Sequence, residues 1–211
     1  MAMIMNSIET DLRRALLSVR FLLAVCLQLA VLWSQGFQST LYKMSVPLAC
    51  ALPYACGWLE EYQSGYVRLA LVRTSFRAYI SGKFLACGIS GGAAEGLAAW
   101  LYMGLHEQAP KIDLGLVFVS AMLWAEVSAL MAALSNSRYL AYGGAFVIFY
   151  FMVILHERYW PRLYCLNPYE WLAPEHSWVL GNTGILLMLS GLILVLALWY
   201  ASILSRRIEY D

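Results

Sequence analysis

The sequence predicts an all-α protein that crosses a membrane several times, and three observations carry this prediction. Hydrophobic residues make up 62% of the 211 residues and charged residues only 13%, against about 25% charged residues in soluble domains. The apolar residues gather in long runs near the length of about 20 residues that crosses a bilayer. No low-complexity linker or soluble domain interrupts the chain, so residues 1–211 are predicted to form a single membrane domain.

The N-terminal residues predict an amphipathic helix on the membrane surface. Apolar side chains recur there at helical spacing between charged ones, at Ile8, Leu12, Ala15 and Val19. Alternatively, this segment simply begins the first span. The start of the chain is too polar and acidic for a secretory signal, so the first apolar run is expected to remain as a membrane anchor.

Six transmembrane helices are predicted from the apolar runs, at about 19–36, 44–59, 84–105, 114–134, 139–155 and 179–204. The second run contains Pro47, Pro53 and Gly57, and it is expected to form a kinked span because neighbouring helices can satisfy the freed carbonyl groups.

The positive charges predict the orientation of these spans. Ten of the 14 Lys and Arg residues lie at the N-terminus, in residues 60–83, in the 135–138 turn and at the C-terminus. The other four are Lys43, Lys111, Arg158 and Arg162. Because cytoplasmic segments carry the positive excess, the chain is expected in the plasma membrane with both termini in the cytoplasm.

Several classes of function find no support in the sequence. The five cysteines lack the paired spacing of a disulfide framework or a metal site. Basic residues cluster only beside the apolar runs, which gives no reason to expect a nucleic acid partner. The chain has no G-x4-G-K-[ST] phosphate-binding loop.

The longest polar stretch, Glu60 to Lys83, predicts a short amphipathic helix over about 60–76. Apolar residues recur there at helical spacing, at Tyr62, Tyr66, Leu69, Val72 and Phe76. Thr74 and Ser75 are expected to end this helix and to cap the next one, which would start near Phe76. The alternative is a solvated loop.

This stretch also carries a family resemblance. Glu61, Gly65, Leu69, Arg77 and Lys83 form the pattern E-x3-G-x3-L-x7-R-x5-K between the second and third predicted spans. Together with the N-terminal surface helix, the six-span topology and the LNPYEW segment at 166–171, the pattern resembles permease subunits of bacterial type-2 ABC exporters. Tyr66 and Thr74-Ser75 depart from it, standing where the family often has Thr and Pro.

The resemblance implies a cytosolic coupling helix that docks on a separate ATPase subunit. That subunit would bind ATP and magnesium, so this chain would bind no cofactor and would not be an enzyme by itself. The resemblance also implies two ATPase subunits and a second copy of the permease. The residues expected to make the coupling contact are Glu60, Glu61, Gly65, Arg68, Leu69, Arg73, Phe76 and Arg77.

Two glutamates inside predicted spans are candidates for the substrate path. Glu95 lies beside a Gly88, Gly92, Gly96 ribbon and Glu126 beside a ribbon of alanines, so both are expected to face packed helices. Counted from Lys83 and from Arg138, each lies 12 residues into its span, which predicts similar depths. Either they hydrogen-bond a neighbouring helix, or they contact a cationic or amphipathic substrate.

The expected cargo is an amphipathic peptide or toxin, and a lipid or drug-like molecule is the alternative. The loop at 156–178 is rich in Trp, Tyr and Pro, which predicts short interfacial or re-entrant helices. Family analogy suggests an extracellular gate there, while interfacial anchoring explains the composition equally well.

Two other functions compete with export. Gly88 to Gly91 reads G-I-S-G and resembles the nucleophile motif of rhomboid proteases, with Ser90 as the nucleophile. That chemistry needs a histidine within hydrogen-bond reach, and all three histidines fall at the outer edges of the predicted spans or in the outer loop. A passive channel or a scaffold is the other competitor.

Overall fold

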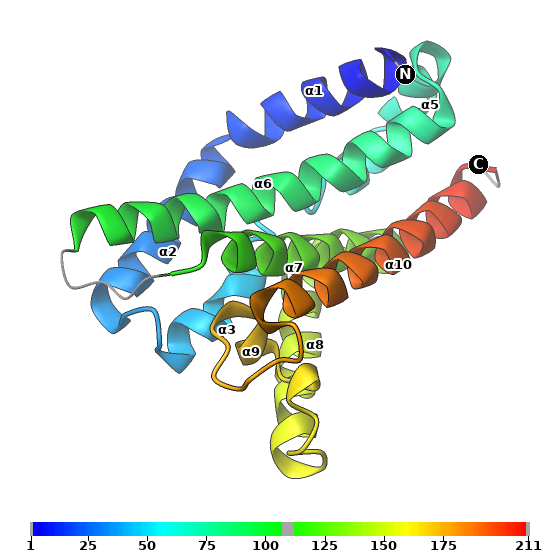
Figure 1. Cartoon of the computed structure of the whole chain (residues 1–211). Coiled ribbons are helices and arrows are strands. Elements are labelled where there is room, and N and C mark those ends of the chain that lie inside the picture. The colour runs from blue at the N-terminus through cyan, green and yellow to red at the C-terminus, as the bar shows by residue number, and fades with distance from the viewer. Residues whose placement is uncertain (1, 107–111, 210–211) are drawn as a thin grey trace.

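The computed structural model describes residues 2–106 and 112–209, with only the backbone for residues 2–7 and 209, and all regular structure in these ranges is helical (Figure 1). The predicted all-α class is therefore confirmed, while Lys111 lies outside the described residues. The helices are α1 Ala2–Leu16, α2 Val19–Gln35, α3 Thr40–Ala49, α4 Gly57–Gln63, α5 Tyr66–Arg73, α6 Phe76–Leu105, α7 Leu114–Ser135, α8 Arg138–Arg158, η1 Tyr164–Leu166, α9 Pro168–Leu172 and α10 Gly181–Glu209.

Four of these helices, α6, α7, α8 and α10, are long and apolar enough to cross a membrane. A fifth span results if the pair formed by residues 8–16 and α2, which meet at an angle of 54°, counts as one broken span. By length and composition the described residues thus supply four or five spans, and the predicted count of six is not confirmed.

The stretch predicted as the second span, 44–59, is divided between two short helices. Helix α3 ends at Ala49, turns fill residues 50–56, and α4 begins at Gly57. Pro53 lies in the turns, where its missing N–H removes a helical hydrogen bond. Ala51, Ala55 and Cys56 are buried in the turns. The expectation of a single kinked helix is therefore wrong.

The polar stretch also forms two helices in place of the single helix expected over 60–76. Helices α4 and α5 meet at Gly65, whose φ of 73° lies in the left-handed region that favours glycine. Thr74 ends α5, and the Ser75 side chain accepts a hydrogen bond from the Ala78 N–H as the N-cap of α6. The break at Thr74-Ser75 and the start of α6 at Phe76 are as predicted.

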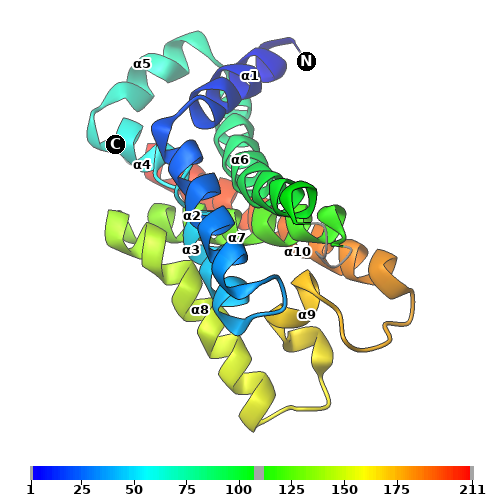
Figure 2. The same cartoon turned by 90° about the vertical axis from the view of Figure 1, so that its left-hand side faces the viewer.

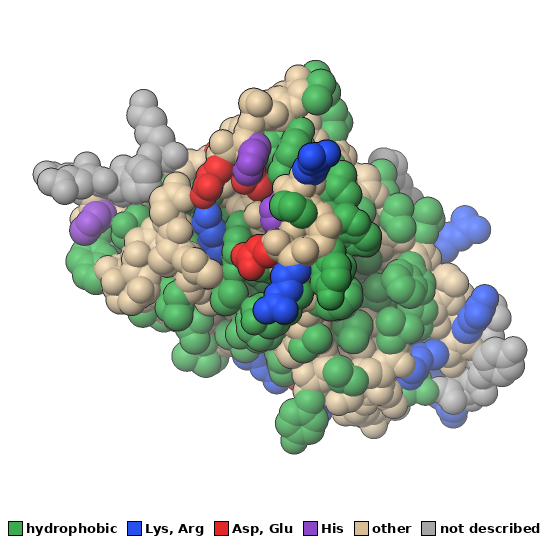
Figure 3. Space-filling view, turned by 90° about the horizontal axis from the view of Figure 1, so that it is seen from below, with side chains coloured by type: hydrophobic (Ala, Val, Ile, Leu, Met, Phe, Trp, Pro, Cys, Tyr) green, Lys and Arg blue, Asp and Glu red, His purple; other side chains and the backbone are tan. Residues whose placement is uncertain are grey.

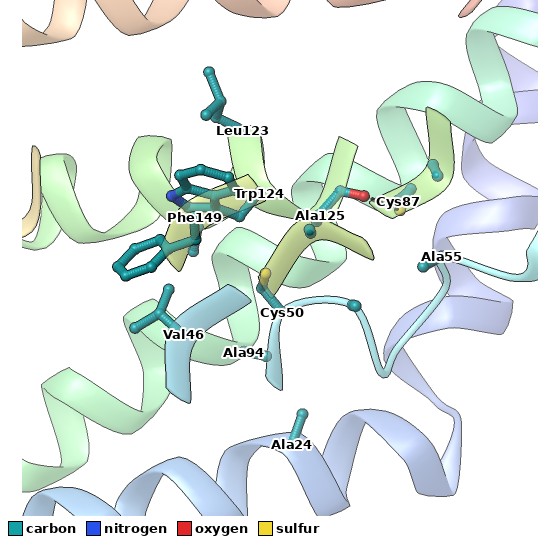
Figure 4. Packing of buried hydrophobic residues seen from close by; sticks show 14 of the residues in the cluster. Ala24, Val46, Cys50, Ala55, Cys87, Ala94, Leu123, Trp124, Ala125 and Phe149 are labelled. Carbon is teal, nitrogen blue, oxygen red and sulfur yellow. Dashed lines mark hydrogen bonds between the residues drawn. The ribbon is translucent and has the colours of Figure 1, made fainter. Parts of the chain in front are cut away.

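Helices α6 and α7 form the centre of the molecule and pack closely through small residues. A Cβ added at Gly91 would stand 2.5 Å from the Ala125 Cβ and 2.7 Å from the Cys50 carbonyl oxygen. The Cys87 thiol donates to the Ala125 carbonyl across the same contact, at 3.3 Å (Figure 4). Gly88 and Gly92 of the predicted ribbon likewise approach Met122 and Phe118 of α7, so the expectation that this face of α6 packs against a helix is confirmed.

The connecting segments gather at two ends of the molecule. At one end, which we call the charged end, Arg20 of α2 pairs with Glu60 of α4, and the Arg207 guanidinium of α10 donates to the Leu134 carbonyl of α7. Both termini and α5 lie toward this end (Figures 1 and 2). The segments that the charge distribution assigns to the cytoplasm lie at the charged end, as far as the structure describes them.

The opposite end, which we call the loop end, joins the remaining connections. Lys43 lies 3.6 Å from Glu175, and the Asn182 amide donates to Asp113 at 2.7 Å. Seen from below, acidic, basic and histidine side chains gather here among hydrophobic ones (Figure 3). The predicted short helices in the 156–178 loop are η1 and α9, and Trp171 of α9 is buried against Trp124 of α7.

Candidate functional site

A buried ion cluster ties three segments together at the charged end. The Lys83 ammonium of α6 donates to Asp11 of α1 at 2.8 Å and to Glu61 of α4 at 2.6 Å. It also donates to the Tyr54 hydroxyl at 2.9 Å, and the Tyr79 hydroxyl donates to the second Glu61 oxygen at 2.8 Å. We call these five residues the Lys83 cluster.

Every charge in the Lys83 cluster has a counter-charge. Lys83 is only 3% exposed and is covered by the rings of Tyr54 and Tyr79, whose centres lie 5.3 and 5.4 Å from its nitrogen. The ammonium donates its three N–H groups to three oxygens, so all of its hydrogen-bond donors are satisfied. Buried charges are tolerated in this form, whereas removal of one partner leaves an uncompensated charge.

The first and last residues of the family-like pattern meet in this cluster. Glu61 and Lys83 stand 22 positions apart in the chain and form its shortest ion pair. Gly65 between them joins α4 to α5 in a left-handed backbone conformation, and Leu69 is exposed on α5. The first and last residues of the pattern are therefore in direct contact in the folded chain.

A cavity of about 350 Å³ opens beside the Lys83 cluster, between α1, α5 and α6. Arg14 and Arg73 contribute two further cations to its wall, and Tyr66 and Thr74 contribute hydroxyl groups. The Arg14 guanidinium lies 3.4 Å from Glu61. The cavity therefore joins the polar stretch to the N-terminal helix.

The eight predicted coupling residues occupy four different places. Glu60 pairs with Arg20, and Glu61 belongs to the Lys83 cluster. Phe76 and Arg77 line a groove between α6 and α10. Gly65, Arg68, Leu69 and Arg73 remain on the outer surface of the α4–α5 turn and α5. The structure thus does not bring the eight together as one surface.

Helix α5 presents apolar side chains to the outside at the charged end. Leu69 is 64% and Val72 86% exposed, and Val67 is the one buried residue of α5. A groove of about 710 Å³ beside them is lined by Tyr62, Leu71 and, from the end of α10, Ile208. Apolar residues rimmed by arginines in this way are typical of protein contact surfaces.

Glu95 is buried and hydrogen-bonded to a neighbouring helix. The Gln28 amide of α2 donates to one Glu95 oxygen at 2.7 Å, and the Ser45 hydroxyl of α3 donates to the Gln28 carbonyl oxygen at 2.8 Å. The other Glu95 oxygen and the buried Tyr42 hydroxyl have no partner among the described residues. The expectation that Glu95 avoids lipid is confirmed, and its neighbours are α2 and α3.

Glu126 is fully buried and has no hydrogen-bond partner for either carboxyl oxygen among the described residues. It faces Gly88 of α6, where an added Cβ would stand 2.5 Å from a carboxyl oxygen. Glu95 lies seven residues further along α6, or about 10 Å at a rise of 1.5 Å per residue. The two carboxyl groups therefore lie at different levels along α6, while their similar depth in a membrane stays a prediction.

The loop end contains one strongly organised carboxylate. Glu170 of α9 accepts hydrogen bonds from the N–H groups of Glu175 and His176, and it meets the His176 ring nitrogen at 2.8 Å. Burial by itself would raise the pKa of Glu170, but these hydrogen bonds and the neighbouring histidine outweigh it, and the pKa lies below its usual value. The Glu170 carboxylate therefore holds residues 175 and 176 against α9.

The arrangement required for a serine protease does not form around Ser90 in the described part of the chain. The Ser90 hydroxyl donates to the Cys87 carbonyl of its own helix at 3.1 Å. His106 packs against Trp33 and Tyr102, and His176 bonds to Glu170. Neither these contacts nor any other described interaction joins a histidine to Ser90.

Several residues of these sites escaped the sequence analysis. Asp11, Tyr54 and Tyr79 complete the Lys83 cluster, and Gln28 and Ser45 complete the Glu95 network. Gln28 had a usable signal, since it is the one polar residue between Phe21 and Trp33.

Comparisons with family models, with curated proteins and with solved structures give no match for this chain.

Proposed function

We propose that this chain is the membrane subunit of an ATP-driven exporter, of the type-2 ABC class that its polar stretch resembles. The arrangement of α4 and α5 at the charged end supports this most directly. Helix α5 exposes Leu69 and Val72 there, while the adjoining α4 is tied to α1 and α6 through the Lys83 cluster. A force applied to α5 would therefore reach a membrane helix through a fully paired, buried contact.

The ATPase is a separate subunit in this proposal, because the sequence has no phosphate-binding loop. Two ATPase subunits, which carry ATP and magnesium, dock beneath two copies of this chain in the plasma membrane. The proposed topology keeps six crossings, with α3, the buried turns and α4 as a broken second span. Both termini face the cytoplasm at the charged end.

The docking experiment uses the exposed residues of α5. Cysteines introduced at Leu69→Cys and Val72→Cys, in a chain whose exposed Cys26 and Cys165 are replaced by serine, should crosslink to an ATP-binding-cassette subunit when the tagged chain is purified from its native membrane. Val179→Cys is the matched control, since Val179 is 95% exposed and lies before α10 at the loop end. Recovery of the chain without such a subunit, or equal crosslinking of the control, would sink the proposal.

The proposed cargo is an amphipathic peptide or toxin, with a lipid or drug-like molecule as the alternative. Glu126 is the better candidate for contact with cargo, because Glu95 already bonds to Gln28. We expect Glu126→Gln to reduce export of a cationic peptide at least severalfold and to leave a neutral peptide unaffected. Glu95→Gln, the matched control, should affect both cargoes alike. Unchanged export by a folded Glu126→Gln variant would remove Glu126 from the substrate path.

A further inference from the structure

A groove of about 700 Å³ runs between the first turns of α6 and the second half of α10. Its volume lies within the range of about 300 to 1,000 Å³ that small-molecule sites occupy. Phe84 of α6 and Tyr200 of α10 pack against each other at 5.5 Å, and both are buried. The groove is separate from the Lys83 cluster and from both membrane glutamates.

The groove is polar at one end and apolar at the other. Helices α6 and α10 run in opposite directions (Figure 1), and the Phe84 to Tyr200 contact sets their register. Residues before Phe84 therefore lie beside residues after Tyr200, at the charged end of the molecule. The polar lining residues are Arg77, Ser81, Ser202 and Ser205, and the apolar ones at the other end are Leu85, Ile193 and Leu194.

Two hydrogen-bond donors at the polar end have no partner in the described part of the chain. The Arg77 side chain is exposed and enters no ion pair or hydrogen bond, and the Ser202 hydroxyl is likewise free. Ser81 and Ser205 donate to carbonyls of their own helices instead. By contrast, Arg14, Arg20 and Lys83 at the same end of the molecule all have carboxylate partners.

We propose that this groove binds one anionic phospholipid. Its phosphate lies at Arg77 and Ser202, and an acyl chain follows Leu85 and Leu194 toward the membrane centre. A guanidinium matches the geometry of phosphate oxygens and binds them with charge-assisted hydrogen bonds. The order of the lining residues, a cation at the membrane edge and apolar residues deeper, is that of a lipid from headgroup to chain.

Charge also decides against a protein occupant. At the charged end the exposed helices α8 and α10 carry Arg138, Arg206 and Arg207, so a second copy of either helix in this groove would bring like charges toward Arg77, and burying such charges is costly. A lipid phosphate neutralises Arg77 and leaves it at the interface. This inference does not depend on the ATPase or on the direction of transport.

The inference is tested by lipid binding to the purified, delipidated full-length chain in detergent. The probes are fluorescent phosphatidylglycerol and phosphatidylcholine with identical acyl chains. The wild type should prefer phosphatidylglycerol by about fivefold, the value expected for one basic residue near a membrane surface. Arg77→Gln should abolish this preference. Arg138→Gln, which removes an exposed arginine from the start of α8 at the same end, should retain it.

Two further arms identify the ligand. Ala197→Trp, which fills the apolar part of the groove, should weaken binding of both lipids, and soluble glycerophosphate should fail to compete because it has no chain. Effective competition by glycerophosphate would replace the lipid by a free phosphate and overturn the proposal. Equal loss of preference in Arg77→Gln and Arg138→Gln would also overturn it, because the preference would then come from the overall positive charge of this end and not from Arg77. Because Arg77 is exposed, its variant decides the question even if Ala197→Trp does not fold.

Discussion

Lys83 illustrates how much one buried residue decides in this protein. A lysine near the end of an apolar run normally extends its ammonium to the interface, and its sequence position suggests that role. In the structure it is instead enclosed by carboxylates from α1 and α4. The difference arises because α6 begins seven residues earlier, at Phe76, so that Lys83 lies two turns inside the helix.

Replacement of Lys83 by methionine should destabilise the protein strongly. Asp11 would remain buried without its counter-charge, and breaking a buried pair in this way costs about 3 to 5 kcal/mol. Thermal unfolding in detergent measures the effect. Arg13→Met is the control, because its ion pair with Glu9 is exposed and joins residues one helical turn apart, so that it contributes about 0.5 kcal/mol or less. Similar losses in both variants would contradict the assignment.

Glu170 predicts a pH dependence at the loop end. Its carboxyl pKa is lowered in the folded state, so its contribution is present above the ordinary pKa of about 4.5 and is lost as the pH falls through the lower, folded value. Melting temperatures between pH 7 and pH 3 should fall in the wild type. In Glu170→Gln they should start lower and fall less. Parallel curves for the two proteins would show that other groups carry the acid sensitivity.

At the scale of elements, the close approach of α6 to α7 depends on glycines with no room for a side chain. Gly91 is enclosed by Ala125 of α7 and by the backbone of Cys50, which cannot rotate away as a flexible side chain could. Hydropathy alone marks α6, α7, α8 and α10 all as candidate spans. The glycine and alanine content of α6 and α7 indicates that these two pack against protein, and the structure buries them most, at 61% and 78% of their apolar windows.

Gly91→Ala should separate these helices and destabilise the protein by about 1 to 3 kcal/mol, the usual cost of overpacking. Gly104→Ala in the same helix is the control, because a Cβ there meets nothing within 4 Å. Alanine is the better helix former, so the control should be unchanged or stabilised by up to about 1 kcal/mol. Thermal unfolding of the two variants gives the comparison, and equal stability would place the tight contact elsewhere.

At the scale of the whole molecule, the two ends separate the connecting segments as the positive charges predict. Labelling with a membrane-impermeant maleimide tests this separation. Cys165 is exposed in the loop region and should react in intact cells. In a Cys165→Ser background, Gln63→Cys at the charged end should react only after the membrane is permeabilised. Labelling of both positions from outside would refute the proposed topology.

The class of the protein and the position of most helices follow from the sequence alone. Hydropathy and helical periodicity are local properties, so they locate α6, α7, α8 and α10 to within a few residues of their observed ends, except for the start of α6. Capping chemistry is local as well, which is why Ser75 correctly marks the beginning of α6.

Only the tertiary structure decided which polar groups meet. The Lys83 cluster joins residues 72 positions apart, and the Gln28 to Glu95 bond spans 67. No local pattern encodes such partners, because each depends on how distant helices pack and on how burial strengthens the need for a counter-charge. The same packing buries the turns at 50–56 and so permits a broken segment where hydropathy predicts one helix. It also separates Arg77, beside an apolar groove, from the rest of the polar stretch.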